Sequence, residues 1–369
     1  MGEPLNVGII GCGAIAAQYL NTFPSLGSIR LQAVADLDPR RAAAVADSSE
    51  NVRALSVDEL LADPEIDTVL NLTIPAAHAE VAAQAIAAGK HVYGEKPLAA
   101  ETTSARHVLE LAENAGVRVG CAPDTVLGTG IQTARKAVDD GLIGRPVAAV
   151  ATMVTPGHER WHPNPDFYYV PGGGPLLDMG PYYVTALVTL LGPVTSVIGS
   201  ASHLREHRTI GTGPRAGKSV PVSVDTHVTG VLVHESGALS TLIMSFDAVQ
   251  TRASNIELHG EEATLTVPDP NYFDGDVSIC TLAGRDNGWD ALPASAGYIG
   301  AGRGYGLADM ALTPAGEQHR ANGQLAYHVL DVMESLLRSA AEGTSVPVQS
   351  TAQRPKAVPL TSLSRLAVP

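Results

Sequence analysis

The position of Lys96 in the sequence suggests a chemical role for its side chain. The run "HVYG" at residues 91–94 predicts a short β-strand, and Glu95, Lys96 and a proline follow it directly. A charged pair at a strand end can mark no more than the emergence of the chain into solvent. It can also hold a reactive group over a cofactor, and motifs elsewhere in the sequence favour that interpretation.

A glycine-rich turn near the start of the sequence predicts a dinucleotide site. The letters "GCGAIA" follow the first apolar run and contain Gly11, Gly13 and Ala16 in the pattern G-x-G-x-x-A. The first glycine permits a tight turn, the second lets the backbone approach a pyrophosphate, and the small third residue lets helix and strand pack closely. The pattern is weak alone, but here a predicted strand precedes it and a predicted helix follows it.

Asp36 indicates which dinucleotide is bound. It ends the second apolar run, about twenty residues after the turn, where a carboxylate can accept hydrogen bonds from the adenosine ribose and repel a 2'-phosphate. NAD is therefore expected over NADP, although Arg40 and Arg41 leave NADP as an alternative. The other interpretation is a surface aspartate that begins an ordinary turn in "DLDPRR".

The elements that must position these residues follow from the hydrophobic pattern. From residue 5 to about 122, short β-branched runs alternate with Ala-rich amphipathic segments, which is typical of a doubly wound parallel sheet. Residues 1–123 are expected to form this α/β Rossmann domain. The expected strands are "LNVGII", "IRLQAVA", "DTVLNL", "HVYG" and "VRVGCA", with helices near 40–47, 77–89 and 101–115.

Residues 124–345 are expected to form a second, α+β domain with a large, mainly antiparallel sheet. Long runs with period-two alternation, such as "VDTHVTGVLVHESGALSTLIMSF", predict strands joined by a tight turn. Helices are expected at 130–141, within "PLLDMGPYYVTALVTLL" and within "GQLAYHVLDVMESLLRSAAEG". Residues 283–306 are expected to be a long loop, and residues 346–369 an extended tail.

Composition argues against several classes of function. The formal net charge of -14 provides no basic surface for nucleic acid or for an anionic membrane. No run approaches the roughly 18 apolar residues that a membrane span requires. Three widely separated cysteines lack the spacing of a disulfide framework or a zinc knuckle, so a reducing cytoplasm is expected.

Three motifs together make the chain resemble the Gfo/Idh/MocA family of glucose-fructose oxidoreductases and inositol dehydrogenases. They are "TIPAAH" at 73–78, "GEKPL" at 94–98 and "GGGPLLDMGPYY" at 172–183, which is similar to the family motif G-G-G-x-x-x-D-x-G-x-H. The resemblance covers essentially the whole chain. It implies an NAD(P)-dependent dehydrogenase of sugars, cyclitols or related polyols that assembles as a homodimer or homotetramer. In such enzymes the strand end carries its lysine to the nicotinamide ring, and the Lys-Pro bond is often cis.

The resemblance also implies the ligand contacts. The cofactor-binding residues would be Gly11, Gly13, Ala14, Ile15, Asp36, Leu37, Arg41, Thr73, Pro75, His78, Glu95 and Lys96. The substrate-binding residues would be Lys96, Asp124, Trp161, His162, Asp178 and Tyr182. No metal is expected.

Tyr182 stands where the family motif has its histidine, which resembles the tyrosine-type variant seen in glucose-fructose oxidoreductase and dimeric dihydrodiol dehydrogenase. Lys96, Tyr182 and Asp178 are therefore the expected catalytic residues. Oxidation of a secondary alcohol needs a base for the hydroxyl proton. A free phenol has a pKa of about 10, so an ammonium such as that of Lys96 is needed to favour phenolate. Asp178 would orient a neighbouring substrate hydroxyl, or would be no more than a helix-start carboxylate.

Aromatic residues concentrate between residues 161 and 183. Of sixteen in the chain, six lie in this stretch, namely Trp161, Phe167, Tyr168, Tyr169, Tyr182 and Tyr183. Flat apolar rings flanked by polar groups suit the C–H faces of a sugar or cyclitol. Tyr183 and Phe167 are equally well explained as core residues.

Three other functions are consistent with parts of the sequence. The letters "HERWH" at 158–162 match the zinc-protease pattern H-E-x-x-H, but prolines at 156, 163 and 165 argue against the helix that this pattern needs. An enzyme of the same fold could cleave glycosides through transient oxidation by bound NAD. A non-catalytic NAD sensor is the remaining alternative, which the joint presence of Lys96, Asp178 and Tyr182 disfavours.

Overall fold

The computed structural model describes residues 3–362, and this part of the chain divides into two compact units. The first unit contains residues 3–128, 296–327 and 358–362, and the second contains residues 129–295 and 328–357. The chain therefore leaves the first unit and re-enters it, whereas the sequence pattern suggested the contiguous ranges 1–123 and 124–345. Local periodicity does not record which distant segment an element packs against, so it could not show this.

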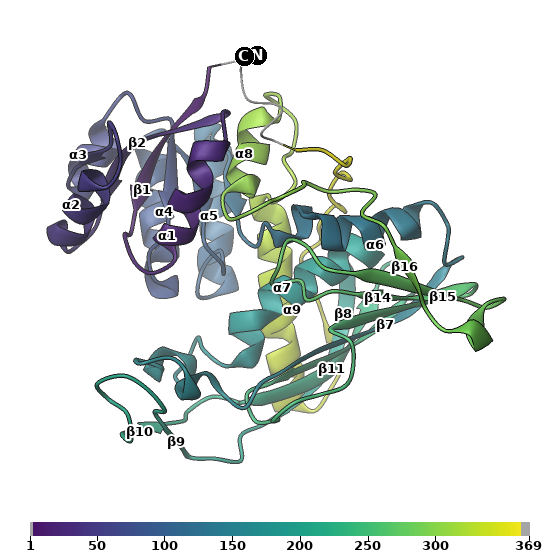
Figure 1. Ribbon diagram of the computed structural model, residues 1–369. Helices are drawn as coiled ribbons and strands as arrows, with labels where there is room; N and C mark the ends of the chain where they lie inside the picture. Colours follow the sequence, from purple (N-terminus) through teal and green to yellow (C-terminus); the bar gives the residue numbers. More distant parts are fainter. Residues whose placement is uncertain (1–2, 363–369) are drawn as a thin grey trace. The chain divides into compact units, whose positions relative to one another are not determined.

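A parallel sheet forms the centre of the first unit (Figure 1). Among the described residues it has six strands in the order β3-β2-β1-β4-β5-β6, and all neighbouring strands are parallel. The strands are β1 (Leu5–Ile10), β2 (Ile29–Ala35), β3 (Arg53–Ala54), β4 (Thr68–Asn71), β5 (His91–Gly94) and β6 (Val119–Cys121). The strand order reverses between β1 and β4, and open α/β sheets bind ligands at the carboxyl strand ends near such a point. The expected Rossmann sheet is confirmed.

Helices cover both faces of this sheet, namely α1 (Ala16–Thr22), α2 (Pro39–Asp47), α3 (Val57–Ala62), α4 (His78–Ala87), α5 (Thr102–Ala115) and α8 (Tyr305–Leu312). Local signals fix their ends. Ser56 and Glu59 form a reciprocal capping box at the start of α3, and Gly116, with a φ of 67°, ends α5 in the left-handed conformation. Val7 and Ile9 of the central strand are fully buried, as expected for a sheet covered on both faces.

The second unit is built on a large mixed sheet. Across its described residues the sheet has nine strands in the order β16-β15-β14-β13-β7-β12-β11-β8-β17; β7 and β12 are parallel, and the other neighbours are antiparallel. The strands are β7 (Pro146–Val154), β8 (Val194–Ser202), β11 (His227–His234), β12 (Leu239–Ser245), β13 (Ile256–Gly260), β14 (Ala263–Val267), β15 (Val277–Thr281), β16 (Asp290–Leu292) and β17 (Val346–Pro347). Strands β9 (His207–Thr209) and β10 (Ser219–Pro221) form a separate ribbon. The expected mainly antiparallel sheet is confirmed.

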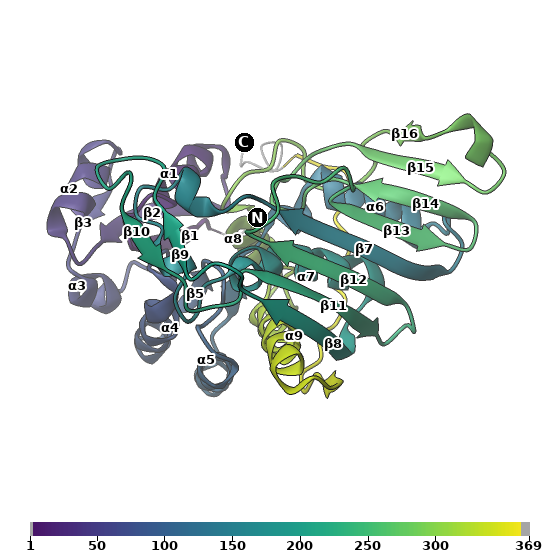
Figure 2. The same cartoon turned by 90° about the horizontal axis from the view of Figure 1, so that it is seen from below.

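Helices α6 (Thr129–Asp139), α7 (Pro175–Leu191) and α9 (Gly323–Glu342) lie on one face of this sheet, and its other face is open (Figure 2). Glycines permit close packing on the covered face. A β-carbon at Gly180 of α7 would lie 2.8 Å from the Met333 sulfur of α9, and one at Gly230 of β11 would lie 2.5 Å from Leu336 of α9. Side chains larger than hydrogen at these positions would push the helices outward, so the glycines help to fix the position of α7.

One expectation about the later part of the chain needs correction. Residues 283–306 are not one long loop, because they contain a 3-10 turn at Arg285–Asn287, strand β16 and the first residues of α8. The tail pairs briefly as β17 and then runs without regular structure as far as residue 362, and its last residues, 363–369, lie outside the described residues. None of the helices in the described part of the chain has the length and apolar character that a membrane crossing requires.

Asp124 anchors the segment that re-enters the first unit. Its side chain is fully buried, and its Oδ2 accepts hydrogen bonds from the backbone N–H groups of Gly304 and Gly306, both at 3.0 Å. Arg303, also buried, lies 3.6 Å from the other carboxylate oxygen. The structure thus gives Asp124 a role inside the first unit, and the substrate contact that the resemblance implied for it remains a prediction.

We expect Asp124→Ala to loosen this segment selectively. The change leaves two buried amides without their acceptor and Arg303 without its counter-charge, a loss of about 3–5 kcal/mol for a broken buried pair. Hydrogen–deuterium exchange of peptides covering residues 302–308 should accelerate. Asp140→Ala is the control, because it removes only an exposed ion pair with Lys136. Unchanged exchange at 302–308 in Asp124→Ala would show that the carboxylate is not the anchor.

Candidate functional site

The candidate site residues fall into two groups, one in each unit, and the first group begins at the glycine turn after β1. Gly11 has a φ of +103°, and a β-carbon there would lie 2.7 Å from the Leu72 carbonyl. At Gly13, by contrast, no heavy atom lies within 4 Å of where a β-carbon would be. Ala16 is buried where α1 begins against the sheet. The turn is thus closed toward the sheet and open at Gly13 and the exposed Ala14, which fits a pyrophosphate lying against the backbone.

Asp36 is held at the end of β2 by backbone amides. Its Oδ2 accepts from Cys12 N–H at 2.8 Å, and its Oδ1 accepts from Asp38 N–H at 2.9 Å. Each oxygen retains a second lone pair that can accept a ribose hydroxyl. Burial, and then the Asp36 charge, raise the pKa of the Cys12 thiol to about 11, so Cys12 is not a reactive thiolate.

The residues beside Asp36 also favour a cofactor without a 2'-phosphate. Arg40 is paired with Asp38 through both Nε (2.9 Å) and Nη2 (2.8 Å), so its guanidinium is already engaged. Leu37 is 97% exposed, which leaves an apolar side chain at this edge. Arg41 is exposed on the first turn of α2. The donor and acceptor set therefore fits NAD.

His78 is the first residue of α4 and lies inside the first unit. It is buried, with Nδ1 2.6 Å from the Pro97 carbonyl and Nε2 3.0 Å from the Thr73 carbonyl. Burial is the main cause that lowers the pKa of its imidazole. The ring lies between the turn after β4 and the turn after β5, and in its neutral form it donates its one proton to one of these carbonyls. The cofactor contact that the resemblance implied for His78 remains a prediction. Thr73 donates its hydroxyl to Asn71, whereas Pro75 is exposed at the edge.

Glu95 is likewise an anchor. It is buried, and its Oε1 accepts the hydroxyl of Tyr19 at 2.8 Å while its Oε2 accepts the Lys96 amide at 3.1 Å. Burial, and then the Glu95 charge, raise the pKa of Tyr19 well above its ordinary value, so its hydroxyl remains a donor. The helix after the glycine turn is thereby tied to the residue before Lys96. The Lys96–Pro97 bond is cis, as the resemblance implied.

The second group lies on and beside helix α7. Asp178 and Tyr182 are four residues apart on α7, so their side chains share one face of the helix. Gly174 precedes the helix with a φ of +89°, which brings the chain into its first turn. Asp178 Oδ2 lies 3.1 Å from His158 Nε2, and Tyr182 is only 5% exposed. Helix α7 thus carries a carboxylate and a phenol on the same face.

His158 belongs to a 3-10 turn, His158–Arg160, within the stretch that matched the zinc-protease pattern. Its Nδ1 accepts the Trp161 indole N–H at 3.3 Å. Its ring centroid lies 4.3 Å from that of Phe246 and 4.7 Å from that of Tyr168. The imidazole is therefore held by polar partners at both ring nitrogens and by contacts with neighbouring aromatic rings.

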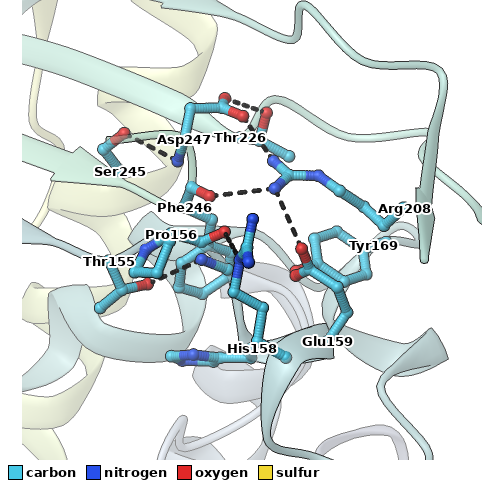
Figure 3. Close-up of polar contacts among 12 residues, drawn as sticks. Thr155, Pro156, His158, Glu159, Tyr169, Arg208, Thr226, Ser245, Phe246 and Asp247 are labelled. Carbon is cyan, nitrogen blue, oxygen red and sulfur yellow. Dashed lines mark hydrogen bonds and ion pairs between the residues drawn. The ribbon is translucent and has the colours of Figure 1, made fainter. Parts of the chain in front are cut away.

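A buried ion network holds this turn in place (Figure 3). Glu159 accepts the Tyr169 hydroxyl and lies 3.4 Å from Arg208 Nη1. Arg208 also donates to the Phe246 carbonyl at 3.1 Å and pairs with Asp247 at 2.5 Å. Because Arg208 is buried between two carboxylates, its charge is compensated, and the turn that carries His158 is fixed to strands β9 and β12.

The zinc-protease pattern has no structural counterpart here. Residues 158–160 form a single 3-10 turn rather than a regular helix, and Glu159 is engaged by Tyr169 and Arg208. Within residues 3–362, no group of three or more His, Cys, Asp or Glu side chains is arranged to hold a metal ion.

The aromatic cluster divides into surface and core members. Trp161 and Phe167 are 57% and 52% exposed, and His162 contacts both rings. Tyr169 and Tyr183 are fully buried, so Tyr183 is a core residue and Phe167 is not. The sequence offered no local signal for the partners that hold these groups, such as Tyr19 and Arg208, because each lies far along the chain from its partner.

Two sequence families match the chain. Residues 5–122 match the family described as "Oxidoreductase family, NAD-binding Rossmann fold", and residues 131–266 match the "GFO/IDH/MocA C-terminal domain". An inositol 2-dehydrogenase 2 of Saccharopolyspora erythraea is 27% identical over 96% of this chain and 99% of its own. A 1,5-anhydro-D-fructose reductase of Ensifer adhaerens is 29% identical over 70% of this chain and 74% of its own.

Solved structures show the same fold. An NAD-binding oxidoreductase from Klebsiella pneumoniae has a TM-score of 0.79 and 24% identity, with 94% of this chain and 99% of that chain covered. A levoglucosan dehydrogenase in complex with NADH and levoglucosan has a TM-score of 0.79 and 21% identity, with 94% and 100% covered. With both of its parts matched and the glycine turn and Asp36 in place, the chain belongs to the GFO/IDH/MocA family of NAD-binding oxidoreductases.

Proposed function

We propose that the protein oxidises a secondary alcohol of a ring sugar or cyclitol with NAD, and that Tyr182 accepts the hydroxyl proton. Lys96 favours the phenolate form of Tyr182, and Asp178 orients the substrate by accepting a hydrogen bond from a neighbouring hydroxyl. The observation that carries this proposal is the arrangement on α7, where carboxylate and phenol lie one helical turn apart.

The two histidines that precede α7 are poorer candidates for the base. The Trp161 indole N–H donates to His158 Nδ1, and the Asn164 backbone N–H donates to His162 Nδ1 at 3.1 Å. A neutral imidazole has one basic lone pair. In both rings a donor already occupies it, which supports Tyr182 as the acceptor.

The first unit would hold the cofactor through its glycine turn and Asp36. When bound, NAD supplies the nicotinamide carbon that accepts hydride. The residues of the chain would bind and orient it: the backbone at Gly13 would face the pyrophosphate, and the carboxylate of Asp36 would accept the ribose hydroxyls. Lys96 stands at the carboxyl end of β5, at the edge of the sheet where such ligands lie.

The substrate class is inferred from the relatives and from the turn beside α7. The relatives named above act on an inositol and on an anhydro sugar. The exposed ring of Trp161 offers a flat apolar surface next to a carboxylate, which suits a ring that carries C–H groups on its face and hydroxyls on its rim.

The first test removes the proton acceptor. Tyr182→Phe should lower turnover by roughly 10²- to 10⁴-fold, the usual contribution of a positioned acid or base, with little change in NAD affinity. Turnover is measured as reduced cofactor with a panel of ring sugars, cyclitols and glycosides. Tyr272→Phe, at an exposed tyrosine, is the control.

Several outcomes of this panel would contradict the proposal. Near-normal turnover by Tyr182→Phe together with loss in His162→Ala would place the base in the turn before α7. Glycoside consumption without net reduced cofactor would indicate cleavage through transient oxidation. NAD binding without turnover of any ring polyol would indicate a sensor.

The second test concerns cofactor choice. The Asp36 carboxylate repels a 2'-phosphate, so the protein should bind NAD at least about tenfold more tightly than NADP, a difference of about 1.4 kcal/mol. Asp36→Ser should reduce that ratio, and Asp47→Ser, at the exposed end of α2, should not. Calorimetric titration with both cofactors measures the ratio; equal or tighter NADP binding by the unaltered protein would contradict the assignment.

We also propose that the protein self-associates through the open face of the large sheet and acts as a homodimer or homotetramer in the cytoplasm. Ile198, Val231, Thr241 and Val150 form one row across four neighbouring strands on this face. A second copy would bury this row, of which Ile198 is 53% exposed. Light scattering should give an oligomer at micromolar concentration and a smaller species for Val231→Lys, and a monomeric unaltered protein would overturn the proposal.

A further inference from the structure

We infer that Trp161 and His158 form a positioning relay that sets the orientation of the Asp178 carboxylate. The relay consists of the Trp161 indole N–H, the two ring nitrogens of His158 and Asp178 Oδ2, joined at 3.3 and 3.1 Å. The inference rests on the proposed function in one respect, because Asp178 is the group that orients the substrate there. The relay itself is a property of the second unit.

Donor and acceptor chemistry permits one neutral form of His158 in this relay. An indole nitrogen can only donate, and an ionised carboxylate can only accept. His158 Nδ1 must therefore carry its lone pair toward Trp161, and Nε2 must carry its proton toward Asp178. In the other neutral tautomer, the Nδ1 proton would face the indole N–H and the Nε2 lone pair would face the carboxylate, so both hydrogen bonds would be lost. Trp161 thus selects the tautomer in which His158 donates to Asp178.

Packing keeps the imidazole at the distance that both bonds require. Phe246 and Tyr168 contact the ring, and the next residue, Glu159, is held by Arg208 and Tyr169. Gly157, with a φ of +109°, precedes the turn, and a β-carbon there would collide with the Glu159 carboxylate. The backbone on both sides of His158 is fixed, so the ring has little freedom except through its two polar partners.

The exposed position of Trp161 gives the relay a function in specificity. Its indole N–H points into the relay while the side chain is 57% exposed, so one residue presents an aromatic face and holds His158. A ring substrate that stacks on this face fixes the indole and, through His158, the carboxylate. Trp161 and His158 are therefore positioning residues, and their removal should affect turnover more than substrate affinity.

The direct test observes the hydrogen bonds without any turnover. The chain has two tryptophans, Trp161 and Trp289, so the indole N–H region of an amide correlation spectrum contains two signals, assigned with Trp289→Phe. The Trp161 signal should exchange slowly with solvent, and His158→Phe should make it exchange rapidly. Histidine labelled with ¹⁵N should show His158 with its proton on Nε2. A rapidly exchanging Trp161 signal in the unaltered protein, or a proton on Nδ1, overturns the relay whatever the activity.

The kinetic test separates positioning from stacking. Trp161→Phe keeps an aromatic face and removes the donor, so kcat should fall about 3- to 10-fold, the value of one lost hydrogen bond, while KM changes less than about twofold. An unchanged kcat, as expected if Trp161 only stacks on the substrate, would overturn the inference. Trp289→Phe is the matched control.

Two further variants test the connection through His158. His158→Gln supplies an amide that can accept from Trp161 and donate to Asp178, and it should retain most of the turnover that His158→Phe loses. Adding Trp161→Phe to His158→Phe should cause no further loss, because the relay is already broken. Additive losses would overturn the relay. If the unaltered protein has no dehydrogenase activity, only the proposed function is overturned. The spectroscopic test would still show whether the hydrogen bonds of the relay exist.

Discussion

The close packing of helix α7 fixes the functional groups of the second unit. Gly180 lets α7 approach Met333 of α9, and Gly199 and Gly230 let Leu336 of α9 settle on strands β8 and β11. An inward-facing side chain at any of these glycines would have to displace a neighbour in a close-packed interior. Asp178 and Tyr182 inherit their positions from this contact. The turn that carries His158 then meets Asp178 at a defined distance because Glu159, within the turn, is paired with the buried Arg208.

The first unit follows the same logic with different partners. Asp36, the open backbone at Gly13 and the exposed residues beside them form the edge that we propose faces the cofactor. In the same unit, the Tyr19 hydroxyl donates a hydrogen bond to Glu95, and the His78 ring lies between the carbonyl groups of Thr73 and Pro97. Residues of the cofactor motifs therefore have two different roles. Some are proposed to face the cofactor, and others are buried and hold the turns that carry the first group.

This division explains how much the sequence could predict. Local sequence patterns predict the parallel and antiparallel sheets, the bounds of α7 and the positions of Gly11, Asp36 and Lys96. They can do so because strand period, helix period and turn glycines act over a few residues. Glu95, His78 and Asp124 could not be separated from ligand-facing residues in this way. Their observed contacts are with Tyr19, Pro97 and Arg303, which are distant in sequence. The return of residues 296–327 to the first unit was hidden for the same reason.

The central claim is that a phenolate, favoured by the Lys96 ammonium, takes the substrate proton. The most direct measurement is the single-turnover rate of cofactor reduction as a function of pH in the unaltered protein, Lys96→Met and Lys96→Arg. The account predicts that the rate rises into the alkaline range, that Lys96→Met moves this rise to higher pH, and that Lys96→Arg, which keeps the charge but does not readily exchange a proton, retains its position at reduced amplitude. A rise centred near pH 6.5, as for an ordinary imidazole, that is unchanged by both substitutions would contradict it.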